Sequence, residues 1–475
     1  MDINQFKKEA HNLVDWMFEY HNNITKYPIK SKVKPGEIYD SLQGSIPENG
    51  ESFDKIFQDF ENKIMPGITH WQNPNFYAFF PANNSFPSIL AEMLISTIGA
   101  QCMMWDTSPA ATELEEKVTD WLRDFMGLPS SWKGVINDTA SIGTICSLLT
   151  ARELKNSFKS NSDGINNNRY RVYGSTEAHS SIEKAVKIIG IGSKNYIKIN
   201  TNSDLSIDIN DLEKKINKDI NNGYVPIAII STFGTTGTVS FDDINKTCLL
   251  ANKYKIWHHI DAAYAGSVLI VDEYKKYIKN LDLADSFLFN PHKWLLTNFD
   301  CSLYYVKDHN LLTKTLEIHP EYLKSSNKKK IKNYKDWSLQ LGRRFRALKL
   351  WFVLRTYGKK GLKKYILNHI NLAKYLNKKI KSDKNFEITC NQNINMINFR
   401  LRPYNSKIKN EDLDKLNFDL ISKLNNTGKI YISHTKVDNK VSIRMPIGST
   451  FADKKNVDES WDLIKKTSNN IIKKN

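Results

Sequence analysis

A carboxylate and a lysine in this chain have the types and the spacing for covalent cofactor chemistry. Asp261 follows the apolar run 256–260, and Lys293 comes 32 residues later in the stretch Phe289-Asn290-Pro291-His292-Lys293-Trp294. A lysine amine can hold pyridoxal 5'-phosphate (PLP) as a Schiff base, and a carboxylate can keep the ring nitrogen of PLP protonated, so that the ring accepts electrons. Either residue alone would be an ordinary strand-end or surface residue. The pair indicates PLP chemistry if the surrounding elements bring the two together.

The elements that must position Asp261 and Lys293 are short apolar runs that alternate with helical segments. A helix is expected from about Ser180, and the runs are 134–136, 170–173, 227–231, 256–260 and 302–306. This alternation predicts an α/β fold with a mostly parallel sheet and helices on both faces. Ligands bind beyond the carboxyl ends of such strands, which is where Asp261 and Lys293 fall.

Helical segments precede and follow this region. Residues 1 to about 80 are expected to be helical, because apolar side chains recur there at roughly helical spacing. A second helix is expected near Ser108, with Ser108 as N-cap, Pro109 at the first helical position and Gly127 closing the helix. A third is expected from about Leu341 to Tyr357.

The chain is predicted to have three parts. These are an N-terminal helical segment (1–80), a large PLP-binding α/β domain (81–362) and a small C-terminal α+β domain (363–475), whose strands are expected at 394–400 and 441–444. Residues 325–333 are polar and have no periodicity, which predicts a flexible loop that could act as a lid.

Composition argues for an ordered, soluble protein. Hydrophobic residues make up 40% and aromatic residues 11% of the 475 residues, so a sizeable core can form. The five cysteines are scattered, odd in number and without a CxxC pair, which fits a reducing cytoplasm. The N-terminus has no signal-peptide core, and there is no apolar run of about 18 residues that predicts a membrane helix.

The formal net charge of +17 raises the alternative of a basic RNA-associated protein. The excess lysines are spread along the chain, and no nucleic-acid-binding motif is present, so no nucleic-acid partner is expected. A catalytically dead scaffold is the other non-enzyme alternative, and the presence of Lys293, Asp261 and His179 argues against it. No metal site is expected, because His258 and His259 are adjacent on a predicted strand and point to opposite faces.

Four longer motifs occur in order: SPAATELE (108–115), AHSSIEKA (178–185), HIDAAYAG (259–266) and NPHKWLL (290–296). They resemble the group II PLP-dependent decarboxylases, and within them the aromatic L-amino acid decarboxylases that act on tryptophan, tyrosine or DOPA. The resemblance covers about residues 60 to 360. It implies a fold-type I enzyme that decarboxylates an amino acid, with PLP as cofactor, and a homodimer whose active sites lie at the interface.

The resemblance implies a role for each matching residue around the cofactor ring. Lys293 would bind the cofactor covalently, and Asp261 would pair with the ring nitrogen. Ala263 would pack on one face of the ring, where a small side chain leaves room, and His179 would stack on the other. Thr236 would form a hydrogen bond near the cofactor.

Two further residues are implied to act on the substrate. His292 would lie near the reacting centre, and Tyr322 would protonate the substrate carbon after CO₂ leaves, since a phenol hydroxyl can act as a general acid. Family members with phenylalanine at the position of Tyr322, or asparagine at that of His179, tend to be aldehyde synthases that use O₂. Both residues present here favour simple decarboxylation, with an aldehyde synthase as the alternative.

The phosphate group of the cofactor is expected at Thr139-Ala140-Ser141, which precedes a helical segment and supplies hydroxyls and amides. Asn290 would add a side-chain amide. The chain departs from the family here, because Asp138 stands where a glycine is usual. A carboxylate near a phosphate is repulsive unless it points away, so the detail of phosphate binding is open.

The substrate is expected to be an aromatic amino acid first, and histidine or another polar amino acid second. Asp106 is unusual for the family and has two open interpretations: it faces the substrate, or it caps the helix near Ser108. The residues that match the aromatic pocket are Trp71, Phe79, Phe80, Pro81 and Met103.

Overall fold

The computed structural model describes residues 1–80, 82–165, 169–318, 331–404 and 408–473. The chain forms two compact units. The first contains Met1–Pro81, Tyr375–Thr389 and Phe399–Asn475, and the second contains Ala82–Lys374 and Cys390–Asn398. The three-part division expected from sequence stays a prediction.

The second unit is built on a seven-stranded sheet with the order β2-β8-β7-β6-β5-β3-β4. β8 is antiparallel to both of its neighbours, and the neighbouring pairs from β7 to β4 are parallel. The mostly parallel sheet is therefore confirmed, although β4 and β7 were not among the expected strands. The strands are β2 (Lys133–Asn137), β3 (Tyr170–Ser175), β4 (Tyr196–Ile199), β5 (Val225–Thr232), β6 (Trp257–Asp261), β7 (Ser286–Phe289) and β8 (Ser302–Val306).

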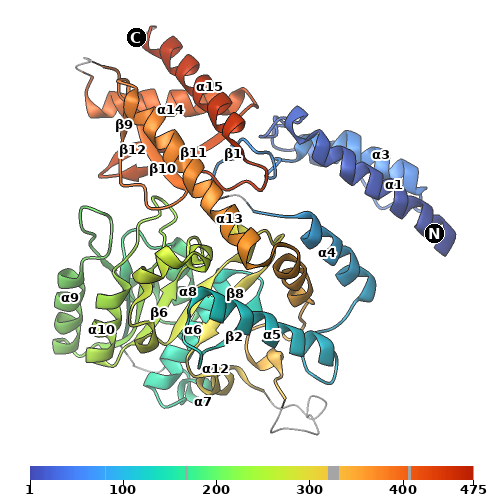
Figure 1. Ribbon diagram of the computed structural model, residues 1–475. Coiled ribbons are helices and arrows are strands. Elements are labelled where there is room, and N and C mark those ends of the chain that lie inside the picture. Colours follow the sequence, from blue (N-terminus) through green and yellow to red (C-terminus); the bar gives the residue numbers. More distant parts are fainter. Residues whose placement is uncertain (81, 166–168, 319–330, 405–407, 474–475) are drawn as a thin grey trace. The chain divides into compact units, whose positions relative to one another are not determined.

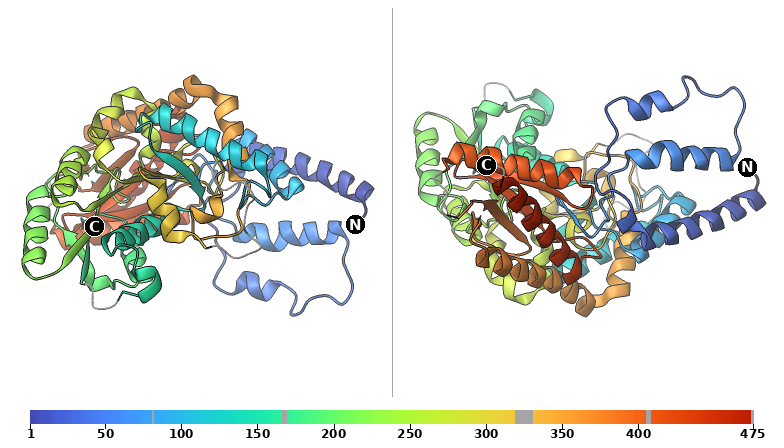
Figure 2. Two further views of the ribbon diagram at one scale, coloured as in Figure 1. Left: turned by 90° about the horizontal axis from the view of Figure 1, so that it is seen from below. Right: turned by 90° about the horizontal axis from the view of Figure 1, so that it is seen from above.

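Helices cover both faces of this sheet (Figure 1). Apolar side chains of α6 and α8 pack on one face with Val172 and Ile230, while those of α9 and α10 pack on the other with Tyr173 and Ile229. The sheet can be followed between these layers in Figure 2. The helices of this unit are α4 (Phe86–Ile98), α5 (Pro109–Met126), α6 (Ala140–Lys155), α7 (Ser160–Asp163), α8 (Ser180–Ile188), α9 (Ile209–Asn221), α10 (Ile244–Tyr254), α11 (Pro291–Trp294), α12 (His309–Leu316) and the first part of α13 (Arg346–Ser382).

The ends of α5 and α13 can be compared with the helix ends expected from the sequence. α5 has Ser108 as its N-cap residue, Pro109 in its first turn and Gly127 in the left-handed region at its C-terminus, as expected. The helix expected from Leu341 begins only at Arg346, because the Arg343 amide donates to Gln101 Oε1 (2.7 Å) and so fixes a loop conformation. α13 is also interrupted at Gly358, whose φ is 57° and ψ is 179°.

A five-stranded sheet has the order β1-β11-β12-β10-β9, and all of it belongs to the first unit except residues 396–398 of β10. β1 lies within the segment expected to be helical; it is two residues long, too short for a recognisable alternation, and pairs in parallel with β11. α14 contacts β11, β12 and α15. The elements are α1 (Ile3–Asn22), α2 (Glu37–Ser41), α3 (Phe53–Asp59), β1 (Phe76–Tyr77), β9 (Phe386–Ile388), β10 (Met396–Leu401), α14 (Asn410–Asn426), β11 (Tyr431–Val437), β12 (Lys440–Pro446) and α15 (Lys454–Ile472).

No helix in the described ranges is both long enough and apolar enough to cross a membrane.

A buried histidine in β6 is expected to make stability depend on pH. His258 is fully buried, shares hydrogen bonds with Ser231 Oγ (2.8 Å) and Cys248 Sγ (3.4 Å), and burial lowers its pKa from 6.5 to about 3. Below pH 6.5 the unfolded chain therefore takes up a proton that the folded chain does not. The stability that His258 contributes is complete above pH 6.5 and is lost as pH falls toward 3.

We therefore expect His258→Asn to reduce the slope of unfolding free energy against pH by about 1.4 kcal/mol per pH unit, measured by urea unfolding between about pH 4.5 and 6. The nearby Asp285 accepts a hydrogen bond from the His258 amide (2.7 Å), and burial raises its pKa to about 6. Asp285 therefore also contributes to the slope in this pH range, and the effect of His258 is the difference in slope between variant and wild type. His11→Asn, on the exposed surface of α1, is the control and should match the wild-type slope. Equal slopes for His258→Asn and wild type would contradict the prediction.

Candidate active site

Asp261 is the last residue of β6 and lies at the carboxyl edge of the seven-stranded sheet. It is 4% exposed, and its Oδ1 accepts a hydrogen bond from the Ala263 amide (3.0 Å). Its neighbours in the sheet are Thr232 of β5 and Leu288 of β7. The parallel strands thus hold a carboxylate at the edge where such sheets bind ligands.

Asp261 and Lys293 both lie close enough to His179 to act on its pKa. The pKa of His179 is lowered, first by burial and also by Lys293, whereas Asp261 raises it. His179 as a whole residue is nevertheless exposed, so its burial is only partial. His179 is the N-cap residue of α8, and its Nδ1 accepts from the Ser181 amide (3.2 Å), so the neutral ring carries its proton on Nε2.

A row of buried polar side chains follows the same edge of the sheet. Asn137 ends β2, and it lies opposite Ser302 at the start of the antiparallel β8. Asn290 follows β7, and the last residues of β5 and β3 are also polar. Within the described part of the chain, buried polar atoms without a hydrogen-bond partner occur at several places, and at this edge they belong to the side chains of Asn137, Ser175, Thr232, Asn290 and Ser302.

Buried polar groups in proteins are nearly always hydrogen-bonded, so this row needs an explanation. The sites are polar, neighbouring and next to Asp261, which fits a bound group that supplies hydrogen-bond partners along the edge. A cofactor with a ring nitrogen, a hydroxyl and a phosphate has that character. Only Asn290 was expected from the sequence. The others were missed because single Asn, Ser and Thr residues at strand ends are too common to signal a site.

His292 adds a neutral imidazole next to Lys293. Both are on the short helix α11, and His292 is 4% exposed. Burial, with a contribution from Lys293, lowers the pKa of His292 to about 3. Its Nδ1 accepts from the Cys301 amide (2.9 Å), which leaves the proton on Nε2 and makes that atom a hydrogen-bond donor.

The predicted phosphate-binding triplet begins α6. Thr139 is the N-cap residue, and its side chain makes no capping hydrogen bond to the helix. The Thr139 hydroxyl instead donates to Asp138 Oδ1 (3.3 Å), and Asp138 Oδ2 accepts from Gln340 Nε2 (3.1 Å). α6 therefore presents the amides of its first turn, including those of Ala140 and Ser141, at the same edge as Asn137.

The turn after β5 brings Thr236 close to the strand ends. Gly234 has a φ of 94°, and a Cβ built on it would lie 2.4 Å from Cβ of Ala265, so only glycine fits there. Thr235 Oγ1 accepts from the Ser240 amide (3.0 Å) and closes the turn. Ala263 is partly buried and packs against the apolar layer that contains α6 and α8.

The residues expected to contact the substrate are divided between the units. In the first unit, Trp71 and Phe79 stack with ring centroids 5.7 Å apart, and Phe80 is buried. In the second, the Met103 carbonyl accepts from the Lys335 amide (2.9 Å). Pro81 and Tyr322 lie outside the described residues.

The structure bears on one of the two interpretations of Asp106. Asp106 is exposed, and Ser108 rather than Asp106 is the N-cap residue of α5, so the capping interpretation of Asp106 was wrong.

Among the described residues, no group of three or more His, Cys, Asp or Glu side chains could hold a metal ion.

A buried ion pair fixes the strand that leads into the triplet. Glu115 of α5 accepts from the Ile136 amide (2.8 Å) and from Arg343 (2.6 Å), and Arg343 also donates to the carbonyls of Ile136 (2.9 Å) and Cys102 (3.2 Å). Both charged side chains are 3% exposed. The pair joins α5, β2 and the loop that carries Met103.

We expect Glu115→Gln to lower the free energy of unfolding by about 3 kcal/mol, because it leaves the Arg343 charge buried without a counter-ion. The measurement is the midpoint of urea unfolding. Glu116→Gln is the matched control on the same helix. Glu116 pairs with Lys332 but is 39% exposed, so its loss should cost less than about 1 kcal/mol. Equal effects of the two substitutions would contradict the prediction.

Comparisons with known proteins bear on the whole chain. The family model for the pyridoxal-dependent decarboxylase conserved domain matches residues 35–402. Tyrosine decarboxylase 4 of Petroselinum crispum is 39% identical over 476 residues, which cover 98% of this chain and 93% of that protein. Phenylacetaldehyde synthase of Arabidopsis thaliana is 38% identical over 486 residues, with 100% and 98% covered. The crystal structure of Oryza sativa TDC with PLP and tryptamine matches with a TM-score of 0.96 and 34% identity over 99% of both chains.

Proposed function

The chain belongs to the family of pyridoxal-dependent decarboxylases, and we propose that it converts an aromatic L-amino acid into the corresponding amine and CO₂. It is an amino-acid decarboxylase of the α/β fold of these enzymes, and its cofactor is PLP. The observation that carries the proposal is that Asp261 and Lys293 both act on the pKa of His179, beside the row of unpaired polar side chains.

The proposed roles at the ring follow from these positions. When bound, PLP supplies an electron sink for the electrons released with CO₂. Lys293 holds the cofactor and releases it to the amino group of the substrate. Asp261, fixed by the Ala263 amide, keeps a proton on the ring nitrogen, and Ala263 leaves room at one ring face. His179 contacts the opposite face as a neutral ring that donates from Nε2.

The proposed roles in phosphate binding and proton transfer use other elements. The first turn of α6 and Asn290 hold the phosphate, and Thr236 donates a hydrogen bond nearby. His292 acts as a neutral donor through Nε2 at the reacting centre. Tyr322 delivers the proton to the substrate carbon after CO₂ has left.

An aromatic substrate is supported by the named activities of the relatives. One relative is a phenylacetaldehyde synthase, which makes oxidative conversion to an aldehyde the second candidate. Tyr322 and His179 favour the decarboxylase. An aldehyde synthase would use O₂ and release ammonia and hydrogen peroxide with CO₂.

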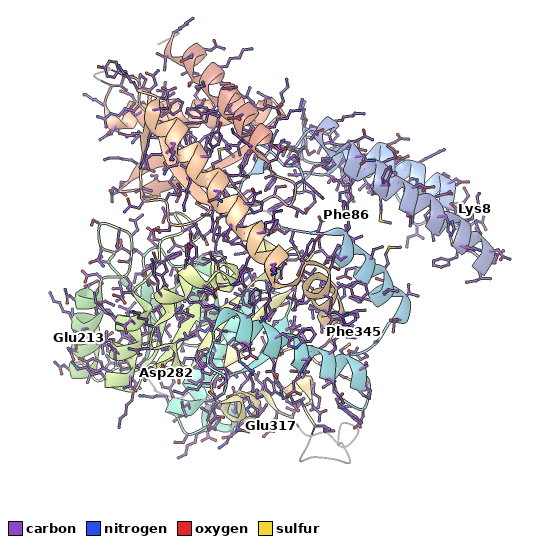
Figure 3. The ribbon with its side chains drawn as sticks, viewed as in Figure 1. Lys8, Phe86, Glu213, Asp282, Glu317 and Phe345 are labelled. Carbon is purple, nitrogen blue, oxygen red and sulfur yellow. The ribbon has the colours of Figure 1, made fainter. Side chains whose placement is uncertain are left out.

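We also propose that the enzyme is a cytoplasmic homodimer. α4 exposes one apolar face made of Phe86, Leu90, Met93, Leu94 and Ile98, at the i, i+4, i+7, i+8, i+12 spacing of a helix stripe. Figure 3 labels Phe86 at the start of this helix. α1 separately exposes Phe6 and Phe18. Exposed stripes of this size are typical of protein interfaces, and a second copy would cover them. The five free cysteines fit a reducing compartment.

The test is a reaction of purified, PLP-loaded protein with a panel of aromatic, imidazole and acidic amino acids, in which CO₂, amine, ammonia and peroxide are recorded together. CO₂ with an equal amount of amine from an aromatic substrate supports the proposal. CO₂ with ammonia and peroxide would replace it with the aldehyde synthase. Turnover of histidine alone would retain the decarboxylase but overturn the aromatic substrate.

A further inference from the structure

Asp138 is an acidic residue at the place where the cofactor phosphate is proposed to bind. It immediately precedes Thr139, the N-cap residue of α6. Its Oδ1 accepts from the amide (2.5 Å) and the hydroxyl (3.3 Å) of Thr139. The helix end that would attract an anion therefore already has an anionic side chain next to it.

The carboxylate is held in this position from the other side. Gln340 Nε2 donates to Asp138 Oδ2 (3.1 Å), and Gln340 Oε1 accepts from the Ser338 hydroxyl (2.9 Å). No cation forms an ion pair with Asp138 among the residues that the structure describes, and Arg346 is engaged by Asp300 (2.8 and 3.2 Å). Asp138 still lies near enough to Arg346 to contribute, after Asp300, to raising the pKa of Arg346. The negative charge of Asp138 is therefore fixed by hydrogen bonds and only partly offset by a cation.

Two physical effects of this arrangement oppose phosphate binding. A phosphate monoester carries about −1.5 to −2 charges at neutral pH, so a neighbouring carboxylate repels it. In addition, the Thr139 hydroxyl has a single proton, which it donates to Asp138. Phosphate must compete with Asp138 for that donor.

We propose that Asp138 weakens the binding of PLP by this enzyme, because its carboxylate repels the phosphate group and competes with it for the Thr139 hydroxyl. The proposal rests on the proposed function, because it takes the first turn of α6 to be the phosphate site. Its consequence is a cofactor that exchanges more readily than it would with a neutral residue at this position. The saturation of the enzyme then depends on the PLP concentration around it.

The test measures cofactor affinity without any reaction. Full-length apoprotein is titrated with PLP, and the dissociation constant is obtained by equilibrium dialysis. Asp138→Asn keeps the size and the acceptor of the side chain but removes the charge, and we expect it to lower the dissociation constant on the order of tenfold. Asp438→Asn removes the same charge from an exposed turn of the first unit and should change the constant less than about twofold.

Two further measurements separate phosphate competition from a general change in the protein. Pyridoxal, which lacks the phosphate, should bind wild type and Asp138→Asn within about twofold of each other. Thr139→Val should cost more PLP affinity in the Asp138→Asn background than in wild type, by about fivefold, because an uncharged asparagine oxygen competes with phosphate for the Thr139 hydroxyl more weakly than a carboxylate does.

The outcomes are distinguishable from failure of the proposed function. Wild type that binds PLP and decarboxylates, with no tighter PLP binding in Asp138→Asn, overturns this inference and leaves the function intact. An equal gain for pyridoxal and PLP also overturns it, because the effect would not act through phosphate. Wild type that binds no PLP overturns both.

Discussion

Lys293→Ala is expected to abolish decarboxylation, with kcat reduced on the order of 10⁴-fold or more. In the structure Lys293 is on α11, directly after the buried His292 and within electrostatic reach of His179. Removal of the amine takes away the group that holds the cofactor covalently and presents it to the substrate. Non-covalent contacts to the phosphate and the ring nitrogen remain, so PLP should still bind, but weakly and without a covalent link.

The measurement combines steady-state kinetics with borohydride reduction and peptide mass mapping. In wild type the cofactor should be trapped on the peptide that contains Lys293, and in Lys293→Ala on no peptide. Lys187→Ala removes a 58% exposed lysine from α8 and is the control, because it should retain both activity and the trapped peptide. Cofactor trapped on another lysine of wild type would overturn the assignment of Lys293.

The sequence predicted the centre of the candidate site better than its surroundings. Asp261 and Lys293 were placed at one sheet edge because each follows an apolar run, and parallel strands carry their carboxyl ends to the same edge. The strand β7, which leads to Asn290 and Lys293, was implied by the apolar run before Lys293, but its residue range was not predicted. It is four residues long and buried throughout, so it has no alternation that would distinguish it from any other short apolar run.

Contacts between distant segments could not be predicted from sequence. Asp138 was expected to repel phosphate unless it pointed away, but nothing near it in sequence indicated that Gln340 binds it from 202 residues along the chain. The same is true of the pair between Glu115 and Arg343, which are 228 residues apart in the chain. Such contacts depend on the tertiary fold, whereas helix ends such as Ser108 and Gly127 depend on local chemistry.

The protonation states of His179 and His292 could not be predicted from the sequence. Both His179 and His292 were expected near the cofactor, but only the structure gives the partner of each Nδ1, which is the Ser181 amide in one and the Cys301 amide in the other. These bonds fix both protons on Nε2. The lowered pKa of each ring then keeps it neutral, so that neither adds a positive charge beside Lys293.

Asp261→Asn is the second substitution with a large expected effect, a loss of about 10²-fold or more in kcat with the fold retained. The asparagine side chain has the same shape, and its oxygen can still accept from the Ala263 amide, which Asp261 Oδ1 accepts now. What disappears is the negative charge that keeps a proton on the ring nitrogen. Loss of one partner of a buried charge pair costs about 3 kcal/mol, which corresponds to about 10²-fold.

The control is Asp243→Asn at the N-terminus of α10. Asp243 caps that helix by accepting from the Lys246 amide (3.1 Å), and its side chain is 40% exposed. Its replacement should cost at most about 1 kcal/mol of stability and leave kcat within about twofold. The absorbance of bound PLP separates the two variants further, because only Asp261→Asn changes the charge at the ring nitrogen. If kcat of Asp261→Asn stays within about fivefold of wild type while PLP is bound, the ring nitrogen does not depend on Asp261. The electron sink would then have to be maintained by another group at this edge of the sheet.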